Sequence, residues 1–112
     1  MTVLVEQARA AVAALNVAVA EQGFDAAVTD GELHDATIAL QKTKSALGVA
    51  GARVLDRWDG RRVWMPGGHL SAASRLSHDA KLARGTAKRE LYRARRLDLM
   101  PLATAAVVEG LL

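Results

Sequence analysis

The chain has 112 residues, of which 51% are hydrophobic and only 4% are aromatic, and it contains no cysteine. The missing cysteine excludes disulfides, thiolate metal sites and a cysteine nucleophile. This length suits one domain whose core is built from Ala, Leu and Val. No run of alternating β-branched residues indicates a sheet, so we expect an all-α fold of about five helices around a long central one.

The formal net charge of +3 is unevenly distributed along the chain. Residues 1–50 carry three basic and six acidic side chains, whereas residues 51–112 carry twelve and six. Such asymmetry indicates that one end faces an anionic partner. Arg outnumbers Lys eleven to four, which suits bidentate phosphate contacts but is equally expected from a GC-rich genome.

The first helix is predicted from Val3 to Gln22, as half of a helical hairpin over residues 1–58. Only Asn16 interrupts the apolar run at 10–20, so this helix needs cover from the rest of the domain or from another chain. The run is about half the length that spans a bilayer and follows no positively charged leader. We therefore expect a buried helix and no membrane contact, with a cytoplasmic location as the default. Gly23 and Phe24 are suited to a Schellman end.

The second helix begins at a capping box formed by Thr29 and Glu32 and is expected to reach Trp58, with Asp59-Gly60 as its stop. Apolar residues repeat every seven positions along it, and we name them the seam: Leu33, Leu40, Leu47 and Val54. Such a heptad pattern favours either packing against the first helix or association with a second copy or another protein.

Residues 59–69 are predicted to form a loop, because Pro66-Gly67-Gly68 interrupts any helix. Arg61 and Arg62 stand close to Trp64. This group could hold a phosphate backbone and stack on a base. Alternatively, Trp64 fills the junction between helices.

Residues 70–101 are predicted to form two helices with a short break, followed by a short apolar helix at 102–109 that leads to a hydrophobic terminus. At 100° per residue, one side of the second helix is basic and the opposite side carries Ala87, Leu91 and Ala94. This outline is typical of a helix-turn-helix DNA reader. A solvated or protein-facing basic helix is the other interpretation. The predicted nucleic-acid contacts are Arg61, Arg62, Lys81, Arg84, Lys88, Arg89, Arg93 and Arg96, and Arg95 extends the arc.

No enzyme constellation is present, and we expect no cofactor and no metal site. His34, His69 and His78 belong to separate segments without metal-ligand spacing. His78 and its neighbour Asp79 are expected to point to different sides of a helix. Ser71, Ser74 and Ser77 recur every three residues, which indicates a helix face and not a nucleophile with its base.

Several short matches share their order with a known family. They are Glu32-Leu33, Asp59, Val63-Trp64, Gly68, Ser71-Ala72-Ala73, Leu76, Leu82, Ala87, Arg89, Arg93-Ala94-Arg95, Leu99, Pro101, Ala103-Thr104 and Gly110. With these residues the chain resembles the domain of unknown function 222, the 13E12-repeat family found in front of HNH endonuclease modules. Lys81 and Ala83 stand where that family usually has a turn glycine and a helix-capping Ser or Thr.

The resemblance implies an all-α, nucleic-acid-associated domain without the nuclease module. Two functions follow as hypotheses: a non-catalytic DNA-binding module that uses the basic helix, or a helical protein–protein interaction or oligomerisation module that uses the seam. A membrane-surface role is disfavoured, because the basic helix has little apolar bulk opposite its charges.

Overall fold

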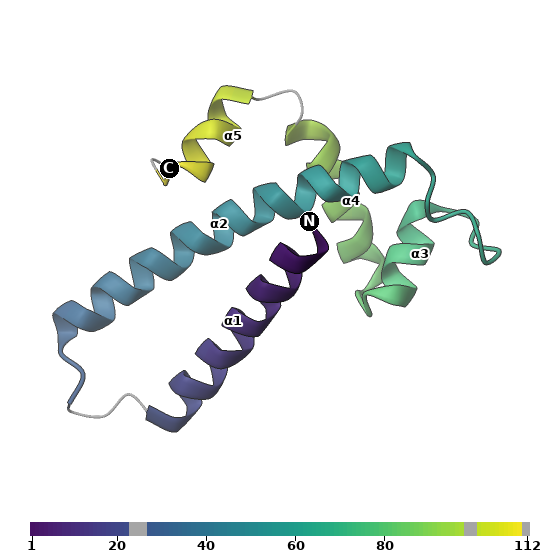
Figure 1. Ribbon diagram of the computed structural model, residues 1–112. Coiled ribbons are helices and arrows are strands. Elements are labelled where there is room, and N and C mark those ends of the chain that lie inside the picture. Colours follow the sequence, from purple (N-terminus) through teal and green to yellow (C-terminus); the bar gives the residue numbers. More distant parts are fainter. Residues whose placement is uncertain (23–26, 98–100, 111–112) are drawn as a thin grey trace. The chain divides into compact units, whose positions relative to one another are not determined.

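The protein is all-α in its computed structural model, which describes residues 1–22, 27–97 and 101–110. These described ranges contain five helices and no strand (Figure 1). The helices are α1 (Thr2–Gln22), α2 (Asp30–Gly60), α3 (Ala72–Asp79), α4 (Arg84–Leu97) and α5 (Pro101–Val108). The expected fold class is thus confirmed, with α2, 31 residues long, as the long helix.

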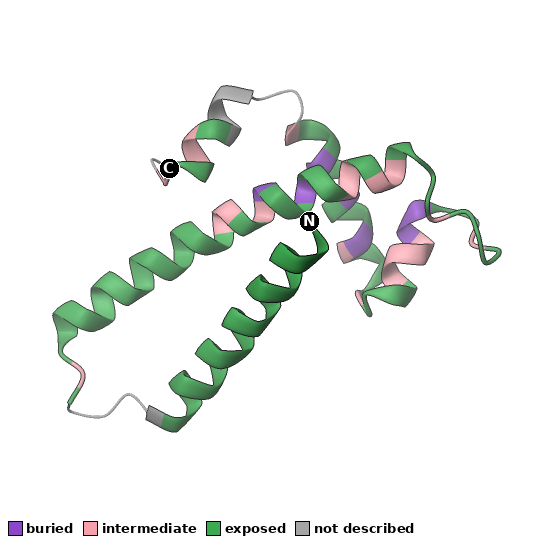
Figure 2. Cartoon of the chain, in the orientation of Figure 1, coloured by how far each residue is buried: buried purple, intermediate pink, exposed green. Residues whose placement is uncertain are grey.

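The chain divides into two compact units, Met1–Thr37 and Ile38–Leu112, and each is described by itself. The first unit holds α1 and the first turns of α2. Residues 2–21 of α1 are all exposed (Figure 2), so the first unit does not itself bury this helix as expected. The physical reason is that this unit contains too little other chain to cover a helix that is apolar on nearly every side.

The apolar part of α1 is also longer than the run from 10 to 20 suggested. Thr2–Glu21 is long and apolar enough to cross a membrane, judged by length and composition only. Core helices and signal sequences share this property. The feature that distinguishes α1 from an ordinary core helix is that none of it is buried.

The two ends of α2 follow known capping geometries. The Thr29 hydroxyl accepts a hydrogen bond from the Glu32 backbone N–H at 3.1 Å, as the capping box predicted. At the other end, the N–H groups of Arg62 and Val63 donate to the carbonyls of Asp59 and Trp58, at 3.0 and 3.2 Å. These bonds form a Schellman motif, and its left-handed residue is Arg62 (φ 53°). The helix ends close to the predicted stop, but Asp59 and Gly60 still belong to the helix and Gly60 is not the residue with positive φ.

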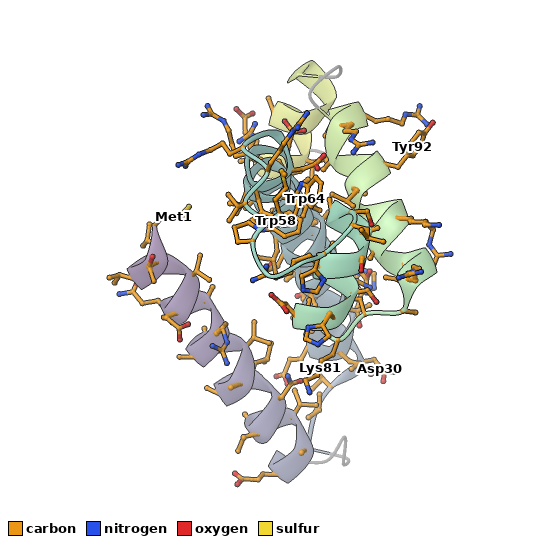
Figure 3. All side chains as sticks on the ribbon, turned by 90° about the vertical axis from the view of Figure 1, so that its right-hand side faces the viewer. Met1, Asp30, Trp58, Trp64, Lys81 and Tyr92 are labelled. Atoms are coloured by element: carbon orange, nitrogen blue, oxygen red, sulfur yellow. The ribbon has the colours of Figure 1, made fainter. Side chains whose placement is uncertain are left out.

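The core of the second unit is small and lies where α2, α3 and α4 bring short side chains together (Figure 2). Its buried hydrophobic residues are Val49, Ala52, Ala72, Ala73, Ala87, Leu91 and Ala94. Trp58 and Trp64 pack against this group (Figure 3). Trp64 therefore fills a junction between elements, as one interpretation of the loop predicted, and its buried Nε1 has no hydrogen-bond partner among the described residues.

The loop between α2 and α3 starts after Gly60, two residues later than Trp58, the predicted helix end. Within it Gly67 and Gly68 both have positive φ, of 96° and 80°. Such backbone is inexpensive only for glycine and reverses the chain direction before α3. The expectations for Gly23, Phe24, Met100, Leu111 and Leu112 lie outside the described residues.

Candidate nucleic-acid interface

The turn that joins α3 to α4 contains residues 80–83, the length found between the helices of a helix-turn-helix pair. The Leu82 N–H donates to the Ser77 carbonyl at 3.1 Å, and Lys81 lies between them in the left-handed region (φ 55°). This is a Schellman close with lysine at the position that glycine usually occupies. The Ser77 hydroxyl also donates to the Leu82 carbonyl at 2.7 Å. The turn therefore forms without a glycine.

Ser71 and Ser77 have capping roles that their three-residue spacing did not indicate. Ser71 is the N-cap of α3, in extended backbone, and its hydroxyl accepts from the Ser74 N–H at 3.1 Å. The interpretation of Ser71 as part of a helix face is therefore wrong, since it precedes the helix. Together these two serines fix both ends of α3, which positions the start of α4.

The basic side of α4 is open to solvent over its whole length. All of its predicted contact residues are exposed, namely Arg84, Lys88, Arg89, Arg93 and Arg96. The opposite stripe of Ala87, Leu91 and Ala94 is buried, with exposed fractions of 0%, 6% and 2%. The predicted division of the helix into a packing side and a solvent side is thus correct.

Nearby groups lie against two of these cations without neutralising them. Arg89 donates to the Thr86 hydroxyl at 3.2 Å. The Arg93 guanidinium lies over Gly48, where an added Cβ would be 3.3 Å from Nη2. Among the described residues, no ion pair involves any of the predicted contact residues.

Arg95 is the exception on α4. Its Nη2 lies 2.8 Å from Oδ2 of Asp59, whose side chain is only 18% exposed. This pair connects the last turns of α4 to the end of α2. Arg95 therefore forms an ion pair within the protein, in contrast to the other cations of α4 within the described part of the chain. This agrees with its place at the edge of the basic arc.

Tyr92 is a surface residue that sequence reasoning did not select. It is 62% exposed, and at 100° per residue it lies between Lys88 and Arg96, four residues from each. In Figure 3 its side chain points away from Trp58 and Trp64. The Arg96 guanidinium stands 5.6 Å from the ring centroid, a cation–π arrangement. The i, i+4, i+8 spacing was a signal that could have identified it.

The other predicted cations belong to separate segments. Arg61 and Arg62 are exposed just after the end of α2, and Lys81 is exposed in the turn before α4.

A shallow groove of about 410 Å³ runs between the start of α3 and α4, lined in part by Lys88, Tyr92 and Arg95.

The seam on α2 is uncovered. Leu33, Leu40, Leu47 and Val54 are between 42% and 53% exposed.

A second polar cluster lies at the far end of α3, where sequence spacing predicted none. The rings of His69 and His78 have centroids 5.6 Å apart. His78 Nδ1 lies 2.8 Å from Asp79 Oδ1, so the expectation that these neighbours point to different sides is wrong.

Asp79 is held by two partners. Hydrogen bonds from His78 and, next in effect, from Arg75 lower the pKa of the Asp79 carboxyl to about 2. The Arg75 Nε lies 2.5 Å from Asp79 Oδ2, and its Nη1 donates to the Pro66 carbonyl. Arg75 thus ties the loop before α3 to the end of that helix.

Comparison of the chain with family models, curated proteins and solved structures finds no match.

Proposed function

We propose that this chain is a non-catalytic DNA-binding module that contacts phosphates through the basic side of α4. The observation that carries the proposal is the combination of exposure and missing counter-charge along this helix. Arg84, Lys88, Arg89, Arg93 and Arg96 are exposed, and none has a carboxylate partner among the described residues. Cations left unpaired on one helix side attract a polyanion with little desolvation cost.

The arrangement around α4 supports this function further. A short helix, a four-residue turn and a longer basic helix are the parts of a helix-turn-helix reader, in which the second helix enters the major groove. Tyr92, central among the cations, supplies a hydroxyl for a phosphate and a ring face for stacking. The resemblance to the domain that precedes HNH endonucleases points the same way, and a cytoplasmic location belongs to the proposal.

The test is a fluorescence anisotropy titration of the chain with a labelled DNA duplex between 50 and 200 mM salt. If each of the five α4 cations neutralises one phosphate, the slope of log K against log salt is about −4.5. Affinity then falls about 500-fold over this salt range. Absence of binding at 50 mM salt and 100 µM protein would overturn the proposal.

A matched pair of variants separates the α4 surface from net charge. Lys88→Gln with Arg96→Gln removes two charges from the basic side and should reduce the slope by about two. Arg9→Gln with Lys44→Gln removes two charges from exposed positions on α1 and α2, and the slope should stay unchanged. Equal effects of the two pairs would mean that α4 is not the binding surface.

The exposed seam favours a second function, self-association through α2. A stripe of four large apolar residues is the surface that two helices bury when they form a coiled coil. Light scattering at tens of micromolar should then give a dimer. Leu40 and Ile38 are both 44% exposed, but only Leu40 belongs to the seam. Leu40→Glu should therefore produce a monomer and Ile38→Glu should not, whereas a wild-type monomer at 100 µM excludes this function.

A further inference from the structure

The cluster at the end of α3 gathers three side chains that first-row metal ions prefer. His69 belongs to the loop before α3. His78 is the last residue but one of α3, and Asp79 is its last residue. One candidate ligand atom from each residue lies within 4.8 Å of the other two. In a tetrahedral site with bonds of roughly 2.0–2.1 Å, neighbouring ligand atoms are about 3.4 Å apart. The widest gap therefore has to close by no more than about 1.4 Å.

The surroundings hold the carboxylate and leave the His78 ring able to move. Arg75 binds the Oδ2 atom of Asp79, so Oδ1 is directed toward the histidines. The His78 side chain is 75% exposed, which leaves its ring free to rotate by the small amount required. Arg75 and His69 pack closely against Gly67. A Cβ added at Gly67 would lie 3.4 Å from Arg75 Nη1 and 3.6 Å from the His69 ring.

We propose that His69, His78 and Asp79 bind one Zn²⁺ ion through a ring nitrogen of each histidine and a carboxylate oxygen of Asp79. Two nitrogens and one oxygen are a ligand set that zinc accepts, and the fourth position is then open to water. Without metal, a proton bridges His78 Nδ1 and Asp79 Oδ1. When Zn²⁺ binds at Nδ1, it displaces the bridging proton, which moves to Nε2 of the ring or to solvent, and the metal takes the place between Nδ1 and Oδ1. This site does not depend on the DNA-binding proposal.

Binding would fasten the loop before α3 to the end of that helix. Asp79 is followed by Ala80 and then Lys81, the left-handed residue of the turn into α4. A metal that binds only the folded form stabilises it by mass action. At a zinc concentration 100 times the dissociation constant, the melting temperature should rise by on the order of 10 °C.

The experiment uses the full chain without a histidine tag. ZnCl₂ is titrated by calorimetry, and CoCl₂ is titrated with visible absorption, because tetrahedral Co²⁺ absorbs far more strongly than the hydrated ion. We expect one Zn²⁺ per chain, the tetrahedral Co²⁺ spectrum and the rise in melting temperature. His69→Gln and His78→Gln should each weaken zinc binding at least tenfold.

His34→Gln is the matched control, because His34 is an exposed histidine on α2 outside the cluster. It should leave zinc affinity and the Co²⁺ spectrum unchanged. Circular dichroism of each variant without metal establishes that helix content is retained, so that weaker binding reports on ligands and not on unfolding. Absence of zinc binding by the wild-type chain overturns the proposal, as does equal loss of affinity in His34→Gln and His69→Gln.

Discussion

Replacing Lys81 by glycine should stabilise the protein. Lys81 has φ 55° at the C-terminal close of α3, and its exposed side chain forms no hydrogen bond or ion pair within the described residues. The left-handed conformation costs an L-residue roughly 1–2 kcal/mol, which glycine avoids. Glycine in turn loses about 0.5–1 kcal/mol more backbone entropy on folding. The net gain is about 0.5–1 kcal/mol, or roughly 2–8 °C in melting temperature.

The assay is thermal unfolding followed by circular dichroism at 222 nm, with Lys81→Ala as the comparison. Alanine removes the same charge and the same long side chain but keeps the Cβ, so it should differ from wild type by no more than about 0.5 kcal/mol. Asparagine tolerates the left-handed region better than most residues, so the stability of Lys81→Asn should be intermediate. If Lys81→Gly is no more stable than Lys81→Ala, positive φ is not what limits this turn and the Schellman assignment is wrong.

Three further substitutions probe the same helices by thermal or urea unfolding. Ala83→Ser places a hydroxyl at the N-cap of α4, where the Ala83 carbonyl already accepts a hydrogen bond from the Ala87 N–H. It should raise the free energy of unfolding by about 1 kcal/mol, whereas Ala80→Ser should not. Ala87→Leu forces three extra carbons into a fully buried position and should cost about 1–3 kcal/mol; a neutral result would mean that the α4 stripe is loosely packed. Asp59→Asn removes the ion pair with Arg95 and should cost about 1 kcal/mol or less, and a cost that persists in 1 M salt would contradict an electrostatic origin.

The helices themselves were predictable because their signals are local. Thr29 followed three residues later by Glu32 is a capping pattern that requires no knowledge of the rest of the fold. The spacing of Ala87, Leu91 and Ala94 likewise identified the packing side of α4, since any neighbour large enough to cover the helix would cover that stripe. Both predictions depend on residues within one or two turns.

The features that were missed depend on where the chain turns. His69 and His78 are nine residues apart, in the loop before α3 and in its last turn, and their rings meet although no residue spacing indicated it. Residue preferences also argued against a tight turn at Lys81, but the bonds from Leu82 and Ser77 compensate for the missing glycine. For α1, composition indicates that a partner surface is needed but not which molecule provides it.

On α4, the residues that stabilise the fold and those that would bind DNA lie on opposite sides of the helix. Burial of Ala87, Leu91 and Ala94 directs the cationic residues outward, because side chains about 180° apart on a helix cannot face the same surface. The basic side is therefore a result of how α4 packs. Substitutions on it should change DNA affinity with little change in unfolding free energy, and substitutions in the stripe should do the reverse. A basic-side variant such as Lys88→Gln that unfolds several degrees earlier than wild type would show that the two sides are not independent.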